Sequence, residues 1–214
     1  ADAPQPPPAP PPIAHWNFNE GSGTAITDIA GGNNGVLALG GGGNTNVPAA
    51  WVPGKAGLPG TAISIDGIDD TINMGPFLNM GTSNFSIGMW VKALSGTGSD
   101  YVIGKWSDTG TAGYVMIYDN IGGVGGMISN GLDASARGLT TAYYDNNTTL
   151  SDPINFHHVV IVVDRALEMR AYIDGVSTNV DTSGVPTETG SIDNGLNFLI
   201  GARNPGADYS GGII

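Results

Sequence analysis

The chain contains 214 residues, with 35 Gly, 14 Pro and no Cys. Its 19 acidic and 7 basic residues give a formal net charge of −12, which makes nucleic acids and anionic lipids poor partners because both would be repelled. The absence of Cys excludes disulfides, thiol catalysis and Cys-ligated metal sites, and no apolar run approaches the roughly 18 residues of a membrane-spanning helix.

A proline-rich arm, ADAPQPPPAPPP, occupies residues 1–12. Such a segment lacks most of its backbone donors and favours an extended, semi-rigid helix. It is interpreted either as a tether or as an element that packs against its own domain or a neighbouring subunit. The opening Ala-Asp-Ala-Pro is typical of a secreted protein after removal of its signal peptide, so we expect an extracellular or cell-surface location.

After the arm, residues 13–214 are predicted to form one β-rich domain. Short apolar segments recur about every ten residues and are separated by Gly, Asn, Asp and Ser clusters, and several alternate with the two-residue period of a half-buried strand. No segment has a convincing helical period. The expected strands are IAHWNFN (13–19), TAISI (61–65), FSIGMWVK (85–92), YVIGKW (101–106), GYVMIYD (113–119), FHHVVIVVD (156–164), EMRAYID (168–174) and LNFLIG (196–201).

The order of these segments resembles the laminin-G-like branch of the concanavalin-A-like jelly rolls found in secreted bacterial proteins. The resemblance extends over nearly the whole chain after the arm. It implies an all-β fold of two antiparallel sheets packed face to face, often with a calcium ion at the rim. The matching segments include AHWNFNEGSGTAITDIAGGNNG (14–35), GKAG (54–57), SIDGIDDTINM (64–74), NFSIGMWVK (84–92), AYIDG (171–175) and LNFLIGA (196–202).

The end of the sequence departs from that pattern. In similar domains the segment equivalent to 211–214 continues as a strand that pairs with the first strand, whereas this sequence stops at Ile214. We therefore expect either a truncated chain or a sandwich that lacks its last strand and accepts one from another copy, because an unpaired edge is a template for strand addition. The residues assigned to such self-assembly are Pro6, Pro7, Pro8, Pro10, Pro11, Pro12, Ile213 and Ile214.

The densest carboxylate group is Asp66, Asp69 and Asp70, which surrounds a Gly-containing turn. Ca²⁺ takes six to eight hard oxygen ligands, so a calcium site is one interpretation. The other is local turn chemistry, in which Asp66 accepts hydrogen bonds from its own turn and its neighbours are solvated. Asp28, beside Gly31-Gly32-Asn33-Asn34, is a second candidate ligand.

Exposed aromatic side chains would serve glycan binding, and four are assigned to it: Trp51, Trp106, Tyr143 and Tyr144. Tyr114 is a further candidate, and burial in the core is the alternative for all of them. Trp16 and Trp90 lie in strand patterns and are expected in the core. Two overlapping glycosylation sequons place candidate acceptors at Asn146 and Asn147.

No catalytic set is recognised. Laminarinase-type hydrolases of similar architecture resemble one another in an E-x-D-x-x-E strand, but Glu20, Glu168 and Glu188 do not have that spacing. His157 and His158 are adjacent on a strand and therefore point to opposite faces, which argues against a shared metal.

Two hypotheses follow. The first is a non-catalytic extracellular structural subunit that associates with copies of itself into a fibre or surface layer. The alternative is a calcium-supported carbohydrate-binding or adhesion module.

Overall fold

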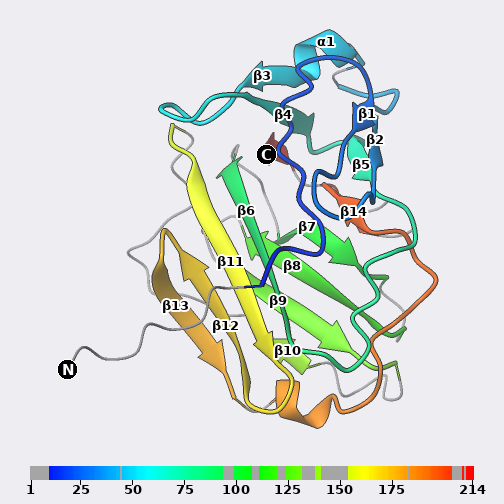
Figure 1. Cartoon of the computed structure of the whole chain (residues 1–214), viewed down its shortest axis with the longest axis vertical. Coiled ribbons are helices and arrows are strands. Elements are labelled where there is room, and N and C mark those ends of the chain that lie inside the picture. The colour runs from blue at the N-terminus through cyan, green and yellow to red at the C-terminus, as the bar shows by residue number, and fades with distance from the viewer. Residues whose placement is uncertain are drawn as a thin grey trace.

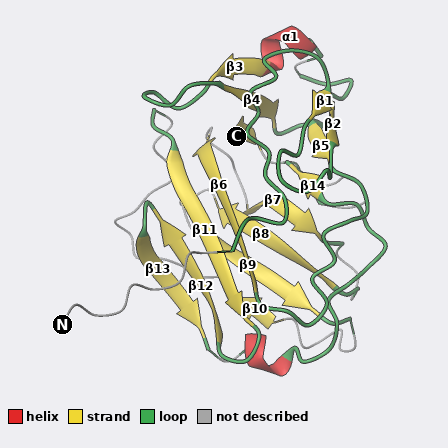
Figure 2. Ribbon diagram, in the orientation of Figure 1, coloured by secondary structure: helices red, strands yellow, loops and turns green. Residues whose placement is uncertain are grey.

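The structure is a computed structural model that describes residues 10–43, 45–93, 99–107, 111–119, 124–131, 138–140, 154–182, 184–203, 209 and 211–214. Within these ranges the chain forms two antiparallel sheets, as Figures 1 and 2 show. The expected all-β sandwich is confirmed. Its helical parts are a four-residue helix, α1 (Val47–Ala50), and a 3-10 turn, η1 (Val185–Thr187). No described helix is long and apolar enough to cross a membrane.

The first sheet has eight described strands and the second has seven. In spatial order the first consists of β1 (Ala25–Ile26), β2 (Gly35–Ala38), β5 (Thr71–Asn73), β14 (Leu199–Ile200), β7 (Ser99–Lys105), β8 (Gly113–Asp119), β9 (Val124–Ser129) and β10 (Gly138–Thr140). The second consists of β13 (Val176–Asp181), β12 (Glu168–Ile173), β11 (His157–Asp164), β6 (Phe85–Ala93), β15 (Gly211–Ile213), β4 (Thr61–Asp66) and β3 (Trp51–Pro53).

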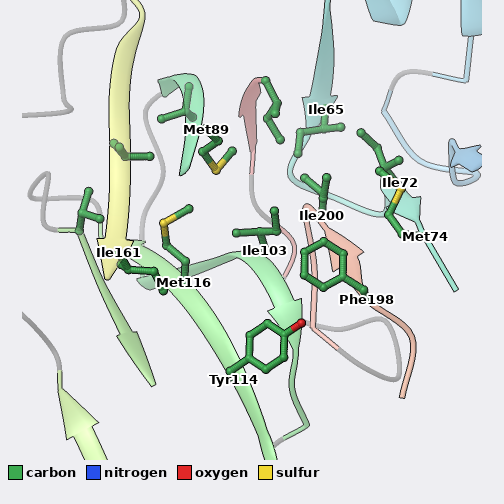
Figure 3. Close-up of a cluster of buried hydrophobic side chains, with 14 of the residues drawn as sticks. Ile65, Ile72, Met74, Met89, Ile103, Tyr114, Met116, Ile161, Phe198 and Ile200 are labelled. Atoms are coloured by element: carbon green, nitrogen blue, oxygen red, sulfur yellow. The ribbon is translucent and has the colours of Figure 1, made fainter. Parts of the chain in front are cut away.

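The core lies between the two sheets and draws its side chains from both (Figure 3). On β6 and β11 the odd-numbered apolar residues point inward; Met89 and Ile161 are examples, and they meet Met116 and Ile103 of the other sheet. The even-numbered residues of β6, β11 and β12 therefore form the outer face of the seven-stranded sheet, because successive strand residues point to opposite faces.

Two buried cations hold the loops at one end of the sandwich. The Lys105 ammonium donates to Asn79 Oδ1 at 2.5 Å, to Asn194 O at 3.2 Å and to Pro76 O at 3.3 Å. Arg165 donates to the carbonyl oxygens of Gly81, Glu188 and Gly190. Burial lowers the pKa of both side chains, and the surrounding carbonyl groups take the place of water around the charges.

The strand expected over 13–19 is wrong. That segment makes one isolated bridge, between Trp16 and Asp28, because its backbone groups are engaged elsewhere. The His15 N–H donates to the Asp28 side chain, and Phe18 has a φ of 52° that no strand residue adopts. The strand expected over 196–201 shortens to Leu199–Ile200, since Gly201 leaves the ladder with a φ of 88°.

Ile213 and Ile214, assigned to self-assembly from the sequence, lie at the end of a strand that is paired on both sides. β15 pairs with β4 on one side and with β6 on the other (Figure 1). Ile214 exchanges two backbone hydrogen bonds with Ile63 and is 6% exposed. Beyond Lys92 and Ala93, however, the described part of β6 has no ladder partner on the β15 side. Among the assigned prolines, Pro10, Pro11 and Pro12 are exposed, and Pro6, Pro7 and Pro8 lie outside the described residues.

Candidate functional site

The carboxylates of Asp66, Asp69 and Asp70 come together at the ends of β4 and β5. Each side chain offers an oxygen, and these oxygens lie within 4.8 Å of one another. Asp66 ends β4, and Asp70 immediately precedes β5. The three residues therefore form one cluster, as the sequence predicted. We call them the acidic cluster.

The glycine segment, residues 40–43, lies against the acidic cluster. The Gly42 N–H donates to Asp69 Oδ2 at 2.8 Å, and the Gly40 N–H donates to Asp70 Oδ1 at 3.3 Å. A Cβ at Gly40 would lie 1.9 Å from the Asp69 carboxyl carbon, so a larger residue would displace that carboxylate. The glycines thus allow the loop after β2 to approach the three aspartates.

The electrostatics of the acidic cluster fit a bound cation. Asp70 is fully buried, and this burial, together with the charges of Asp66 and Asp69, raises its pKa. The buried Oδ1 atom of Asp69 has no hydrogen-bond partner among the described residues. A hard divalent cation with oxygen ligands would both neutralise the adjacent charges and satisfy that atom.

Asp28 does not belong to this cluster. Its Oδ1 accepts from His15 N and Ala30 N, and its Oδ2 accepts from Asn33 N and Asn33 Nδ2, all at 2.8–3.0 Å. Burial alone would raise its pKa, but the backbone hydrogen bonds outweigh burial and hold the pKa far below the usual value. The prediction of Asp28 as a metal ligand is not supported, because both oxygens already organise the loop around residues 28–34.

The aromatic residues assigned to glycan binding are buried where the structure describes them. Trp51 is 9% exposed and donates its Nε1–H to Gly23 O. Trp106 is 6% exposed, and Tyr114 is 1% exposed with its hydroxyl donating to Leu78 O. These predictions are wrong because the large rings fill the sandwich interior. The remaining assigned residues, Tyr143, Tyr144, Asn146 and Asn147, lie outside the described residues.

Trp90, expected in the core, is instead 38% exposed on the outer face of β6. His158 lies directly opposite on β11, with ring centroids 5.0 Å apart. The Lys55 ammonium sits 4.8 Å from the centroid of the Trp90 ring, a cation–π contact. The sequence does contain a signal for this exposure. Trp90 is an even number of residues from Ser86, Gly88 and Lys92, so it lies on the same face of the strand as these residues and opposite to its apolar neighbours.

Gly88 presents no side chain beside Trp90, and a Cβ at this position would lie 3.3 Å from Val160 Cγ2. It lies two residues earlier on the same face, opposite Val160 of β11, and Val160 in turn lies opposite Tyr172 of β12. A Cβ at Gly88 would stand 3.6 Å from His158 Nε2, so that nitrogen lies close to the glycine. The name "Trp90 face" is used below for Lys55, Gly88, Trp90, Lys92, His158 and Val160.

A concave region lies on the outer side of β2 and β5. It is an open groove of about 480 Å³. The side-chain oxygens of Asn34 and Asn73 accept from Asp28 N and Gly75 N, both at 2.9 Å. Their NH₂ groups have no hydrogen-bond partner among the described residues. The groove is lined by Asn34, Val36, Ala38, Asn73, Met74, Gly75, Phe77 and Asn197.

The glutamates and His157 have structural partners. Glu20 accepts from Thr27 N, Glu168 makes a two-point ion pair with Arg170, and buried Glu188 accepts from Asn130 N. His157 Nδ1 lies 2.7 Å from Asp174 Oδ2. These side chains therefore stabilise strands and turns and do not form a pair of facing carboxylates.

A family model described as the concanavalin A-like lectin/glucanases superfamily matches residues 66–214. No curated protein sequence matches the chain.

Solved structures with a similar fold include the following three. The CBM40 of the Ruminococcus gnavus IT-sialidase, bound to α2,3-sialyllactose, is 15% identical with a TM-score of 0.51, over 72% of this chain and 85% of that one. The binding domain of Paraclostridial Mosquitocidal Protein 1 is 17% identical with a TM-score of 0.55, over 94% of this chain and 46% of that one. A Trypanosoma rangeli sialidase is 13% identical with a TM-score of 0.51, over 91% of this chain and 28% of that one. The chain thus spans less than half the length of the last two structures, and the similarity at these identities concerns the fold.

Proposed function

The chain belongs to the concanavalin A-like lectin/glucanases superfamily, and from that premise we propose that it is a non-catalytic glycan-binding module. The observation that carries the proposal is Trp90, a large aromatic ring exposed on a sheet face and flanked by Lys55 and His158. Indole rings provide an apolar surface on which the CH groups of a sugar can stack, with polar groups at the edge for its hydroxyls. An extracellular location accompanies this proposal, because polymeric glycans are abundant on and outside cells.

The acidic side chains support the non-catalytic part of the proposal. Retaining hydrolysis needs two carboxyl groups about 5 Å apart on either side of the scissile bond. In the described residues, the closely spaced carboxylates are those of the acidic cluster, and they accept hydrogen bonds from backbone N–H groups of the glycine segment and of their own turn. β6 contains no Asp or Glu, and the one carboxylate of β11, Asp164, lies six residues from His158, the residue opposite Trp90.

We propose that a calcium ion stabilises this fold. The acidic cluster would hold it through Asp66, Asp69 and Asp70, and the ion would supply charge neutralisation where Asp69 Oδ1 now has no partner. Its position at the junction of β4, β5 and the loop after β2 fits a structural role. We assign no sugar contact to it, because the Trp90 face lies on other strands.

A glycan array with purified protein tests the function. Wild-type protein is expected to retain a subset of glycans, and Trp90→Ala is expected to lose that retention, with an affinity decrease of about tenfold or more. Leu167→Ala is the matched control, since Leu167 is 64% exposed at the turn between β11 and β12. It should bind as the wild type does.

A further variant, Asn73→Ala, distinguishes the groove over β2 and β5 from the Trp90 face. If Asn73→Ala abolishes retention and Trp90→Ala does not, the glycan site lies in the groove over β2 and β5. Absence of retention on arrays that contain neutral and acidic glycans would contradict the proposed function. Unchanged melting temperatures would show that each variant is folded.

Self-association is a second candidate, and one observation favours it. The described part of β6 from Phe85 to Val91 has β11 on one side and no ladder partner on the other. An unpaired strand edge accepts an added strand, so a segment of a second copy could pair there. Light scattering and negative-stain microscopy, with and without EDTA, test this candidate: fibres or oligomers support it, and uniform monomers contradict it.

A further inference from the structure

Positive charge gathers on the Trp90 face of a strongly acidic protein. The chain has a net charge of −12, yet Lys55 lies over Trp90 and Lys92 follows it on the same face of β6. Arg170 lies on the same outer face, on β12. Among the other described cations, Lys105 and Arg165 are buried, and Arg203 follows β14 of the other sheet. Among the described residues, the cations that are neither buried nor on the other sheet therefore lie on the outer face that carries Trp90.

The charges nearest Trp90 are not neutralised by carboxylates. Arg170 is paired with Glu168 at 2.8 Å and contributes little net charge. Lys55 and Lys92 make no ion pair among the described residues. The ion pairs within those residues are Arg170–Glu168 and His157–Asp174. Asp174 is the carboxylate at this end of β11, and its oxygens accept from His157 Nδ1 and His158 N. The two lysines are thus available to an external anion.

The geometry relates this charge to the aromatic surface. The Lys55 Nζ atom is 4.8 Å from the Trp90 centroid, so an anionic group bound to Lys55 would lie beside the indole ring. The ring nitrogens of His158 have no hydrogen-bond partner among the described residues, and its Nε2 would lie 3.6 Å from a Cβ at Gly88. A ring-shaped ligand on Trp90 would therefore lie near both a cation and an imidazole.

We propose that the glycan recognised by the Trp90 face is anionic, a pyranose whose ring stacks on Trp90 and whose carboxylate or sulfate pairs with Lys55 and Lys92. This proposal rests on the proposed function and names its ligand class. The rest of the protein surface repels such a ligand, so binding depends on this local charge, and screening by salt weakens it.

The test compares sugars that differ in charge alone. Titration calorimetry at 50 mM NaCl uses a galacturonate trisaccharide against its methyl ester, and dextran sulfate against dextran. We expect one or both anionic probes to bind at least tenfold more tightly than the neutral counterpart, and 500 mM NaCl to remove most of that difference. The first pair reports a carboxylate ligand and the second a sulfate ligand.

Variants locate the charge recognition. Lys55→Gln and Lys92→Gln are each expected to weaken binding of the anionic probe by about threefold to tenfold, Lys55→Arg to retain it, and Trp90→Ala to abolish it. Arg203→Gln removes the same charge away from the Trp90 face and is the matched control, expected to bind as the wild type does. All these side chains reach the surface, and thermal melts check that each variant is folded.

The outcomes separate the two proposals. Equal affinity for the acid and its ester, lost in Trp90→Ala, overturns the anionic assignment and leaves glycan binding intact. Binding of the anionic probe that is as weak in Arg203→Gln as in Lys55→Gln also overturns it, because general charge attraction would then be responsible. If no neutral or anionic glycan binds, both the glycan-binding function and the anionic ligand class are refuted.

Discussion

Asp28 organises the N-terminal part of the sandwich through one carboxylate. Its two oxygens accept four N–H donors, which come from His15, Ala30 and Asn33. Because Asp28 is 6% exposed, these donors replace the water that would otherwise solvate its charge. The ion is thereby a structural anchor for two segments that do not form a regular strand pair.

Replacing Asp28 with Asn should lower the free energy of unfolding by about 1–3 kcal/mol, because an amide offers one acceptor oxygen to four donors. The depressed pKa also fixes the sign of the pH dependence. The stabilisation by ionised Asp28 is fully present above the ordinary pKa of 3.8 and is lost as the pH falls from there toward the lower pKa of the folded state. Urea denaturation of both proteins between pH 7 and pH 2.5 measures this. A difference that grows on acidification would contradict the assignment.

At single positions, the sequence could identify the acidic cluster but not which aromatic rings are exposed. Asp66, Asp69 and Asp70 are adjacent in a turn, so their proximity follows from local geometry. The exposure of Trp90 depends on which side of β6 faces the other sheet, a tertiary property that its apolar neighbours on both sides obscured. The available signal was the even spacing of Trp90 from Ser86 and Lys92, which places all three side chains on the same face of β6.

At the scale of elements, the long apolar strands were predicted and the short ones were not. β8 and β11 were found nearly at their predicted bounds. β2, β5 and β15 have three or four residues each and carry Gly, Asn or Thr, so they have too few residues to show a period. These strands exist because neighbouring strands supply their hydrogen-bond partners.

Calcium is expected to join elements that the sequence places far apart, namely the glycine segment after β2 and the turn between β4 and β5. Adding Ca²⁺ to EDTA-treated protein should raise the melting temperature, since an ion bound only by the folded state stabilises it. Asp69→Asn should reduce that rise strongly, because it removes one of the three charges and the oxygen that has no partner.

Differential scanning fluorimetry with Ca²⁺ and Mg²⁺ measures the calcium effect. Asp193→Asn is the control, since Asp193 lies in another loop, where it accepts from Gly81 N. A wild-type melting temperature that does not respond to Ca²⁺ would refute the calcium proposal and leave turn chemistry as the role of the acidic cluster.

β15 offers a matched pair of substitutions. Ile214 is 6% exposed and belongs to the core, whereas Ile213 lies on the outer face between Ser64 and Lys92. We expect Ile214→Ala to lower the free energy of unfolding by about 2–4 kcal/mol and Ile213→Ala to lower it by less. Equal effects in chemical denaturation would mean that the strand register is different.

At the scale of the whole molecule, the two sheets approach closely at Gly126 of β9. A Cβ there would lie 2.8 Å from Met169 Sδ and 3.2 Å from Ile161 Cδ1 of the opposite sheet. Gly126→Val should therefore separate the sheets and cost about 1–3 kcal/mol. Urea unfolding followed by both tryptophan fluorescence and far-UV circular dichroism measures it, and a stability equal to that of the wild type would contradict this packing.

The two-sheet sandwich could be predicted from the sequence, whereas the pairing of β15 with β4 and β6 could not. Turn spacing, strand periodicity and segment order together indicated two antiparallel sheets. The insertion of β15 between β4 and β6 depends on contacts between residues more than one hundred positions apart, and no local pattern encodes such a pairing. For the same reason the sequence assigned Ile213 and Ile214 to self-assembly, whereas the structure places them at a strand that is paired on both sides.

The place of β15 also sets an order of events during synthesis. The middle of the seven-stranded sheet remains incomplete until residues 211–214 have left the ribosome, although β4 and β6 were translated long before. The chain contains no Cys that could hold the nascent strands together, and closing a sheet through distant contacts is slow. Molecular chaperones would therefore meet this protein with the inner edges of β4 and β6 still unpaired, and release from them would coincide with the arrival of β15.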